Sequence, residues 1–339
     1  MEKPSKKLYV ARPRGFCAGV DRAIDIVELA LELYGIPLYV KHAIVHNVHV
    51  VKSLEKRGVI FVDDVQEIPK GSTVIFSAHG SPPQEFAAAD QLNLNVIDAI
   101  CPLVAKVHLE VRRFSRLGYD IIMVGHKGHV EPIGTLGNTQ KSAKSFLIET
   151  ADEARVLQVP QEDKLAVVTQ TTLSINETKE VLAILQERFP KAEFPKKEDI
   201  CFATTNRQGA VKRMLPYIQA LCVVGSQSSS NSNRLRELGE KAGIPSYLVD
   251  DAEHIQPEWF TNVSSVGLTS GASVPEYLFE EVKEYFYKKG FQNTEEIKGS
   301  DEDVHFSLPF EFTREAKEKK KGEKIVKKHK IESGKKMRT

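Results

Sequence analysis

Residues 8–34 read LYVARPRGFCAGVDRAIDIVELALELY, and they contain one complete strand–loop–helix unit. Its apolar start, Leu8 to Ala11, predicts a short buried strand. Apolar side chains then recur at helical spacing from Val20 to Tyr34, and Gly35 and Pro37 supply a stop signal. A strand, a glycine-bearing loop and an amphipathic helix together form the repeating unit of α/β proteins with parallel strands.

The same unit recurs along the whole chain of 339 residues. Further strands are predicted at Leu38 to Val45, Thr73 to Ser77, Ile121 to Val124, Leu165 to Val168, Ala220 to Val224 and Ser265 to Leu268. Further helices are predicted at Leu103 to Leu117, Leu173 to Phe189, Ser232 to Ala242 and Pro275 to Lys289. We therefore predict an α/β architecture with mostly parallel strands.

The composition is that of an ordinary globular protein. Hydrophobic residues make up 41% and charged residues 27%, which allows a large core and excludes disorder over the whole length. No apolar run approaches the roughly 18 to 20 residues of a membrane-spanning helix. Met1 to Lys7 lack the apolar stretch of a signal peptide. A cytoplasmic location and no membrane span are expected on these grounds.

Charge is divided unevenly along the chain. Residues 314–339 contain twelve Lys or Arg and four acidic residues, whereas the remaining residues contain 35 basic and 42 acidic ones. A mildly acidic body gives no reason to expect nucleic acid on its main surface. The segment 313–339 lacks apolar periodicity and is expected to be a basic, disordered tail, the one place where nucleic acid stays a candidate partner.

Polar, glycine-bearing segments follow the predicted strands. They are GFCAGVD, HNVHVV, AHGSPP, GHKGHVEP, TQTTLS, GSQSSSNSN and TSGASVPE. In parallel α/β sheets, ligands bind beyond the carboxyl ends of the strands, where helix N-termini present free N–H groups. One shared site built from several sheets is the economical interpretation.

Three of the four cysteines occupy matching strand-to-helix junctions: Cys17 in PRGFCAGVD, Cys101 in DAICPLVAKVH and Cys201 in DICFATTNRQ. Their spacings of 84 and 100 residues suggest one cysteine per α/β unit, and hence three similar units around a centre. We place the units at residues 18–101, at 102–198, and at 1–17 with 199–312, the last including a C-terminal extension. Cys222 lies inside an apolar run and is interpreted as a core residue.

The chemistry of the three junction cysteines is open at this point. Each alone is more often structural than catalytic, but a helix N-terminus stabilises a thiolate, the form that binds metal. The spacing lacks the C-x-x-C pairs of a zinc ribbon, and soft thiolates select either zinc or iron and sulfur. Three cysteines on a four-iron cluster would leave one iron open to substrate. Such an iron acts as a Lewis acid and passes electrons, whereas zinc provides only the first.

A second set of polar residues favours an anion. The set comprises His46 and His79, which follow strands, Ser229, Ser230 and Asn231 near the start of a helix, and Ser273 in a similar loop. Helix N-termini with hydroxyl and amide donors bind phosphate-like groups. Plain N-capping and surface histidines are the alternative. The G-x-x-x-x-G-K-[ST] and G-x-G-x-x-G fingerprints are absent, which argues against a nucleotide triphosphatase or a dinucleotide enzyme.

A proton source is predicted in the loop GHKGHVEPIG, which contains His126, His129 and Glu131. If this loop is extended, His129 and Glu131 point the same way because they are two residues apart. A carboxyl group beside an imidazole and a hydroxyl can relay protons, and Thr171 and Thr172 offer hydroxyls from another strand end. A solvated loop acid is the alternative for Glu131.

Taken in order, the motifs resemble those of the 4-hydroxy-3-methylbut-2-enyl diphosphate reductases, the last enzymes of the non-mevalonate isoprenoid pathway. The resemblance covers residues 8 to about 300 and rests on ARPRGFCAGVDRAI, VHNVHVV, DAICPLVAKVH, GHKGHVE, TQTTLS, ICFATTNRQ, GSQSSSNSNRL and TSGAS. It implies a pseudo-threefold cloverleaf of α/β units around one 4Fe–4S cluster per chain. The implied ligands are Cys17, Cys101 and Cys201, with the fourth iron open to the substrate hydroxyl.

The resemblance also assigns the other residues. It implies Glu131 as proton donor, Thr171 as its hydroxyl partner, and His129 close by. The implied diphosphate contacts are His46, His79, Ser229, Ser230, Asn231 and Ser273. The implied reaction is a two-electron, two-proton reductive dehydroxylation of (E)-4-hydroxy-3-methylbut-2-enyl diphosphate to isopentenyl and dimethylallyl diphosphates. A ferredoxin or flavodoxin-type protein would supply the electrons.

The chain departs from the family pattern at Ile100, Val130 and Ser228, where threonine, proline and asparagine are usual. None of these changes removes an implied ligand or acid.

Two alternative functions stay open. A three-cysteine 4Fe–4S dehydratase of the quinolinate synthase type would need arginines for a dicarboxylate. A nucleic-acid-binding or ribosome-binding protein would depend on the basic tail.

Overall fold

The structure is a computed structural model and describes residues 6–195 and 198–318. The strands are β1 (Lys7–Arg12), β2 (Leu38–Lys41), β3 (Val59–Val62), β4 (Thr73–Phe76), β5 (Asn95–Asp98), β6 (Asp120–Val124), β7 (Ser145–Ile148), β8 (Leu165–Thr169), β9 (Ala220–Val224), β10 (Ser246–Val249), β11 (Ser265–Ser270) and β12 (Asn293–Lys298). The α-helices are α1 (Ala18–Tyr34), α2 (Val48–Glu55), α3 (Pro83–Gln91), α4 (Pro102–Arg116), α5 (Val130–Leu136), α6 (Ala151–Val156), α7 (Ile175–Arg188), α8 (Phe202–Met214), α9 (Ser230–Lys241), α10 (Glu276–Lys288) and α11 (Phe310–Glu318). Short 3₁₀ helices are η1 (Val65–Glu67), η2 (Leu215–Tyr217), η3 (Ala252–His254) and η4 (Pro257–Phe260).

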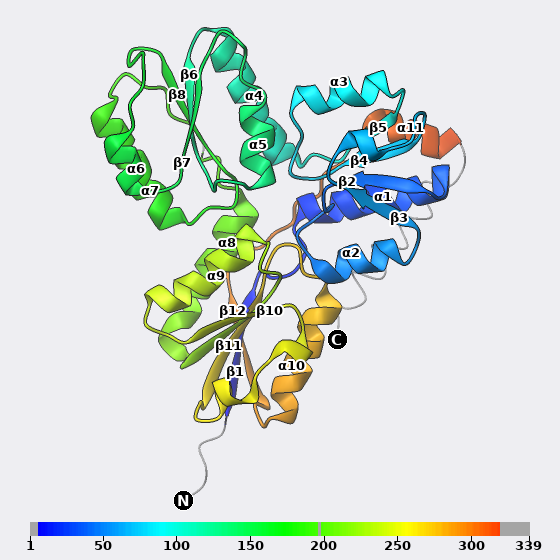
Figure 1. The fold of residues 1–339 in the computed structure, drawn as a ribbon. Coiled ribbons are helices and arrows are strands. Elements are labelled where there is room, and N and C mark those ends of the chain that lie inside the picture. The colour runs from blue at the N-terminus through cyan, green and yellow to red at the C-terminus, as the bar shows by residue number, and fades with distance from the viewer. Residues whose placement is uncertain (1–5, 196–197, 319–339) are drawn as a thin grey trace, which may run out of the picture.

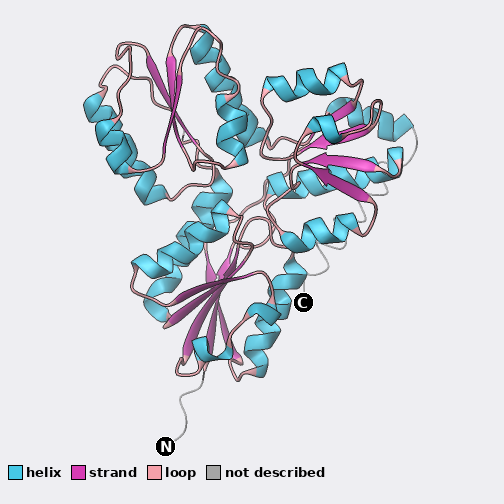
Figure 2. Cartoon of the chain, in the orientation of Figure 1, coloured by secondary structure: helices cyan, strands magenta, loops and turns pink. Residues whose placement is uncertain are grey.

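Over the described ranges the strands form three separate sheets, and every strand pairing is parallel. The strand orders are β3-β2-β4-β5, β7-β6-β8 and β10-β9-β11-β1-β12. Each sheet forms a lobe of its own, and the three lobes meet at a common centre (Figure 1). Helices cover both faces of each sheet (Figure 2). The predicted α/β fold of three units is confirmed.

Each cysteine helix packs against the sheet that follows it in the chain. Helix α1 leaves the five-stranded sheet and buries Ile24, Val27 and its other apolar residues against the four-stranded sheet. Helix α4 follows β5 and packs Val107 and Val111 on the three-stranded sheet. Helix α8 returns the chain to the five-stranded sheet. The three cysteines therefore lie at the points where the chain passes from one unit to the next.

The cysteine loops are fixed by equivalent backbone hydrogen bonds. The amides of the three cysteines donate to carbonyls in the loops after β11, β4 and β8: Cys17 to Ala272 at 3.1 Å, Cys101 to Ala78 at 2.9 Å and Cys201 to Thr171 at 3.0 Å. Since each cysteine is also the N-cap of its helix, the three settings are alike. This repetition is the pseudo-threefold relationship expected from the sequence.

The structure differs from the predicted pattern in several places. It contains β3, β5, β7, β10 and β12 in addition to the predicted strands, and β2 ends at Lys41 rather than at Val45. Cys201 does not directly follow a strand, because the described residues before it make a single β-bridge, between Ala166 and Glu193. The unit boundaries at residues 101 and 199 stay a prediction.

The C-terminal segment crosses from the five-stranded sheet to the four-stranded one. After β12 it reaches α11, where Phe312 is buried and stacks on Tyr34 at a centroid distance of 6.4 Å. The predicted start of the tail at residue 313 is therefore too early, since α11 continues to Glu318. The rest of the basic tail lies outside the described residues.

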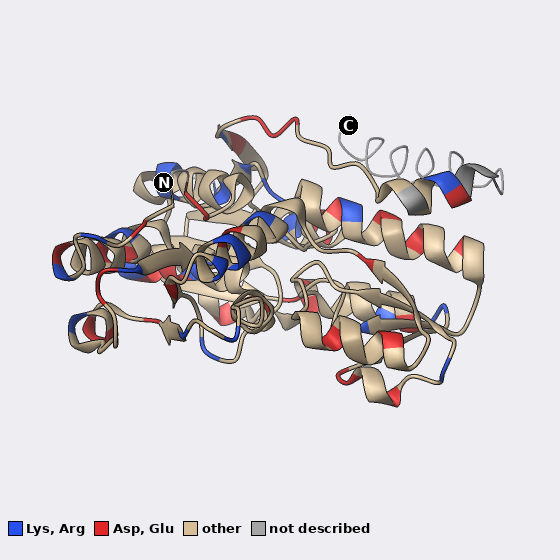
Figure 3. Cartoon of the chain, turned by 90° about the horizontal axis from the view of Figure 1, so that it is seen from above, with Lys and Arg blue, Asp and Glu red and all other residues tan. Residues whose placement is uncertain are grey.

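Lys and Arg are interspersed with Asp and Glu along the helices (Figure 3). Among the residues that the structure describes, none of the helices combines the length and the apolar character that crossing a membrane requires.

Candidate active site

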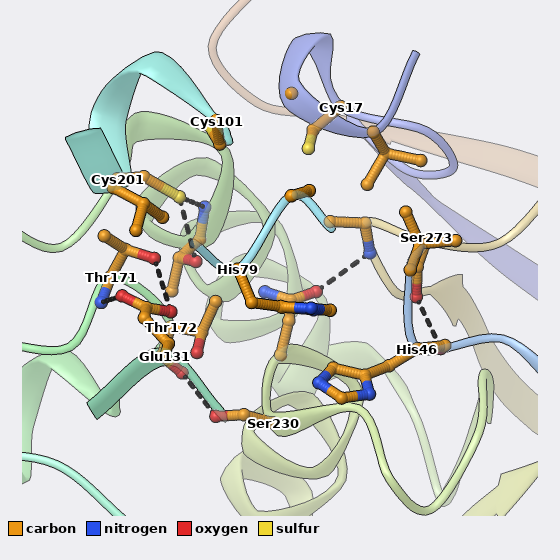
Figure 4. A pocket seen from close by; sticks show the side chains of 18 of the residues that line it. Cys17, His46, His79, Cys101, Glu131, Thr171, Thr172, Cys201, Ser230 and Ser273 are labelled. Carbon is orange, nitrogen blue, oxygen red and sulfur yellow. Dashed lines mark hydrogen bonds between the residues drawn. The ribbon is translucent and has the colours of Figure 1, made fainter. Parts of the chain in front are cut away.

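One cavity at the meeting point of the three units is lined by every residue that the resemblance assigns to catalysis or binding. These are Cys17, His46, His79, Cys101, His129, Glu131, Thr171, Cys201, Ser229, Ser230, Asn231 and Ser273. The cysteines lie at one end and His46 and Ser230 at the other (Figure 4). Loops after strands of all three sheets contribute, as expected for the carboxyl ends of parallel strands.

Gly19 brings two of the sulfurs close together. A Cβ atom at this position would lie 2.7 Å from the Sγ of Cys101 and 4.0 Å from the Sγ of Cys17. Both sulfurs therefore face the same small space, which only a residue without a side chain leaves open. The glycine two residues after Cys17 is a sequence signal for this space, and the sequence analysis missed it.

Burial decides the protonation of the three thiols. It raises the pKa of Cys101 to about 12 and that of Cys201 to about 11, and it raises the pKa of Cys17 as well. Amides in the first turn of each helix lower these pKa values, as predicted for helix N-termini, but their effect is smaller than that of burial. Buried thiols become thiolates when a metal replaces their protons.

The donor set fits a group larger than one ion. Within the described residues, no three His, Cys, Asp or Glu side chains converge closely enough to hold a single metal ion. Yet the three thiols line one cavity, and Cys101 interacts electrostatically with both Cys17 and Cys201. Soft sulfur ligands spread around a shared space match a metal–sulfur cluster better than a lone zinc.

Thr204 supports Cys201 and was missed by the sequence analysis. Its amide lies 3.4 Å and its hydroxyl oxygen 3.2 Å from the Sγ of Cys201. The threonine lies three residues into the helix that Cys201 caps, which is the usual position for a capping contact. The C-x-x-T pattern could have indicated it.

Three neutral histidines gather at the other end of the cavity. The ring centroid of His46 lies 4.1 Å from that of His79 and 5.1 Å from that of His129. Burial lowers the pKa of His46 to about 4 and that of His129 to about 3, and it lowers the pKa of His79 too. Each imidazole therefore has one N–H to donate at neutral pH.

The hydroxyl and amide groups beside these histidines are held by hydrogen bonds to neighbouring loops. Ser273 donates to the carbonyl of His46 at 2.9 Å, and Ser230 donates to the carbonyl of Thr172 at 3.1 Å. Ser229 caps α9. The Oδ1 of Asn231 accepts from the amide of Ala272 at 3.0 Å, so its amide nitrogen is the free end.

Two buried polar atoms at this end have no protein partner. The Nε2 of His46 and the Nδ2 of Asn231 make no hydrogen bond within the part of the chain that the structure describes. Buried donors without partners are rare in native proteins, and each calls for a ligand or an ion. They lie where a helix N-terminus and several hydroxyls already favour an anion.

Glu131 is a buried acid, and Thr171 donates two hydrogen bonds to its carboxylate. The carboxylate accepts from the Thr171 amide at 2.7 Å and from its hydroxyl at 3.1 Å. With 2% of its surface exposed, Glu131 has its pKa raised by burial to about 7, against the opposing effect of Thr171. A solvated loop acid is therefore excluded.

The loop around Glu131 is not extended, which corrects the sequence expectation. His129 is the N-cap of α5 and accepts the Glu131 amide on its Nδ1 at 3.1 Å. His126 instead pairs with Glu149 at 2.8 Å.

Three other residues from the sequence analysis lie in different surroundings. Thr172 lines the cavity, whereas Cys222 is fully buried in the five-stranded sheet and Ser228 is exposed outside the cavity.

The fold and the cavity together define a three-unit α/β protein whose central site has a thiol end suited to a metal–sulfur cluster and an opposite end whose donors suit an anion. A family model described as LytB protein matches residues 8–287. The chain belongs to this family.

Curated relatives agree over nearly the full length. A 4-hydroxy-3-methylbut-2-enyl diphosphate reductase from Tolumonas auensis is 51% identical, covering 90% of this chain and 99% of the relative. Another from Ralstonia nicotianae is 50% identical, covering 89% and 93%. The solved E-1-hydroxy-2-methyl-but-2-enyl-4-diphosphate reductase from Plasmodium falciparum is 39% identical, with a TM-score of 0.90, and covers 94% of this chain and 100% of that one.

Proposed function

We propose that this chain is a 4-hydroxy-3-methylbut-2-enyl diphosphate reductase, the last enzyme of the non-mevalonate pathway. It would convert its substrate into isopentenyl and dimethylallyl diphosphates. The proposal is supported by the relatives' names and by one observation above all. A buried, protonatable carboxyl group lies in the same cavity as three cysteine thiols and a set of anion-binding donors.

The three thiols would hold one 4Fe–4S cluster. Cys17, Cys101 and Cys201 provide three ligands, which leaves one iron without a thiolate. When bound, the cluster supplies electrons and a Lewis-acidic iron at the substrate hydroxyl. Gly19 keeps the space between two of the sulfurs open.

The opposite end would hold the diphosphate. His46, His79 and Asn231 offer neutral N–H donors, and Ser229, Ser230 and Ser273 offer hydroxyls. Such donors bind phosphate oxygens in a buried site with charge-assisted hydrogen bonds. Binding would also give partners to the two buried donor atoms of His46 and Asn231.

Glu131 would supply a proton to the departing hydroxyl. The overall conversion takes up two electrons and two protons, breaks the C–O bond, and releases water with a new C–H bond. A carboxyl group with a pKa of about 7 is half protonated at neutral pH, which suits a general acid. The Thr171 amide and hydroxyl fix its orientation, and His129 lies two residues away at the cavity wall.

The proposal also includes a protein electron donor and a cytoplasmic location. A ferredoxin or flavodoxin-type protein would deliver the electrons. The cytoplasm is a reducing compartment, in which the free thiols of Cys17, Cys101, Cys201 and Cys222 persist.

The dehydratase alternative has no support in the cavity. Among the described residues that line it, none is an arginine or a lysine able to hold a dicarboxylate. The relatives named above are likewise reductases, and they cover 89% to 94% of this chain.

Metal content under strict anaerobiosis, followed by turnover with a chemical reductant, tests the proposal. We expect about four irons and four sulfides per chain, and formation of both diphosphate products with viologen reduced by dithionite. An equimolar dicarboxylate should not compete. Stoichiometric zinc without labile sulfide would overturn the proposal.

A further inference from the structure

Each cysteine helix carries a cation that reaches the segment just before the next cysteine. Arg22 in α1, Lys106 in α4 and Arg207 in α8 follow Cys17, Cys101 and Cys201 by five, five and six residues. All three cations therefore lie one to two turns into a helix that begins at a cysteine.

The contacts of the three cations form a closed cycle. The Nη1 of Arg22 donates to the carbonyl of Ile100 at 2.9 Å, directly before Cys101. The Nζ of Lys106 lies 3.1 Å from the Oδ1 of Asp199, two residues before Cys201. The Nη2 of Arg207 donates to the carbonyl of Gly15 at 2.7 Å, two residues before Cys17.

Each of these contacts involves at least one buried group, although Lys106 itself is partly exposed. Arg207 has no exposed surface, Asp199 has a fully buried carboxylate, and Arg22 is 9% exposed. A buried cation costs several kcal/mol unless it is paired and hydrogen-bonded. Keeping two buried cations, and a third that reaches a buried carboxylate, in equivalent places needs a reason beyond the stability of any one helix.

The C-terminal segment completes two of the contacts. Arg22 donates through its Nε to the carbonyl of Ser307 at 2.9 Å. Arg207 donates to both carboxylate oxygens of Glu302, at 2.9 and 3.0 Å. The segment after β12 thus holds the cations of α1 and α8 in their places behind the cysteines.

We propose that Arg22, Lys106 and Arg207 are positioning residues that tie the three cysteine segments into one ring and set the reduction potential of the cluster they hold. This inference rests on the proposed function. Hydrogen bonds around a ligand shell orient the ligands, and charge near a cluster shifts its potential. A nearby positive charge stabilises the reduced, more negative cluster.

Lys106 offers the cleanest test, because its side chain is 37% exposed and its loss leaves no cavity in the core. We expect Lys106→Met to release iron to a chelator at least several-fold faster and to shift the midpoint potential to a more negative value. Lys106→Arg should restore both. Arg113→Met removes an equal charge from an exposed position on the same helix and should change neither.

Glu302→Gln tests the charge effect with the opposite sign. It leaves Arg207 its bonds to Gly15 and to the Ala203 carbonyl, and it removes the negative charge beside it while keeping one oxygen that can accept from Arg207 or Asn206. The midpoint potential should therefore rise. Redox titrations of the holoenzyme, followed by the cluster absorbance, measure both shifts.

Potentials and release rates that match the unmodified holoenzyme in both Lys106→Met and Glu302→Gln would overturn the inference. A shift of the same sign in both variants would do the same, because it would indicate a general loosening of the site. Absence of iron and sulfide from the unmodified protein would instead overturn the proposed function.

Discussion

Thr171 binds the Glu131 carboxylate twice, with its backbone amide at 2.7 Å and its hydroxyl at 3.1 Å. Glu131 lies in the first turn of α5, which follows β6, and Thr171 lies in the loop after β8, so the pair joins the ends of two neighbouring strands of the three-stranded sheet at the cavity. The carbonyl of Thr171 also accepts the amide of Cys201. The acid and one cysteine are thus positioned by a single residue.

Replacing Glu131 with glutamine should abolish proton donation and leave the shape of the site nearly unchanged. We expect Glu131→Gln to lower kcat by about 10² to 10⁴, the usual contribution of a general acid, while substrate binding and iron content stay as they are. Turnover with reduced viologen, calorimetric binding and iron analysis give the three quantities. An unchanged kcat would exclude Glu131 as the donor.

The acid form of Glu131 should impose a descending limb on the pH profile. Because its pKa is about 7, the protonated fraction, and with it kcat, should fall about tenfold per pH unit well above 7. Thr171→Val removes a hydroxyl that stabilises the charged form, so the limb should move to higher pH. A limb that stays at the same pH in Thr171→Val would contradict the assignment.

Burial of Glu131 should also make the metal-free protein less stable at higher pH. A carboxyl whose pKa is raised on folding, here from 4.5 to about 7, stabilises the native state below its unfolded pKa. That contribution is lost as the pH rises through the folded value, and it is on the order of 3 kcal/mol. Urea unfolding at several pH values should show this slope between pH 4.5 and 7, and Glu131→Gln should lack it.

Replacing Gly19 with alanine should weaken metal binding and slightly stabilise the metal-free protein. In Gly19→Ala, the new methyl group would lie 2.7 Å from the Sγ of Cys101 and displace it, so we expect most of the iron to be lost. The metal-free protein should gain up to about 1 kcal/mol, because alanine favours a helix over glycine.

Gly209→Ala in α8 is the matched control for this change. Its methyl group would meet nothing closer than Arg213 at 3.6 Å, so it should bring the same gain in stability with full iron content. Iron retention by Gly19→Ala would show that the sulfurs do not need the space at residue 19.

Cys101→Ser should lower iron to a small fraction of the unmodified content, because it removes one of the thiolate ligands. Cys222→Ala is the control, since Cys222 is equally a free cysteine but lies fully buried in the core of the five-stranded sheet. Equal iron loss in both variants would contradict the assignment of the ligands.

The strands that the sequence predicted are those with apolar runs, such as β9, whose five residues are all buried. The edge strand β12, with the sequence NTEEIK, is mostly exposed and has no apolar pattern, so only its pairing with β1 reveals it. Motifs located the cavity residues because most of them follow a strand end; Cys201 is the exception. Local sequence could not reveal the cycle of Arg22, Lys106 and Arg207, because each partner lies at least 78 residues away.

The three cysteines lie where the chain passes from one unit to the next. A change in the angle between two lobes therefore changes the distances between the sulfurs. A lobe that rotates as a rigid body carries one corner of the sulfur triangle with it. Substitutions far from the cavity, in the packing of α1, α4 or α8 on their sheets, should therefore appear first as weakened iron retention. Conversely, loading the metal should freeze the lobes relative to one another, which amide hydrogen exchange at the three crossings would record.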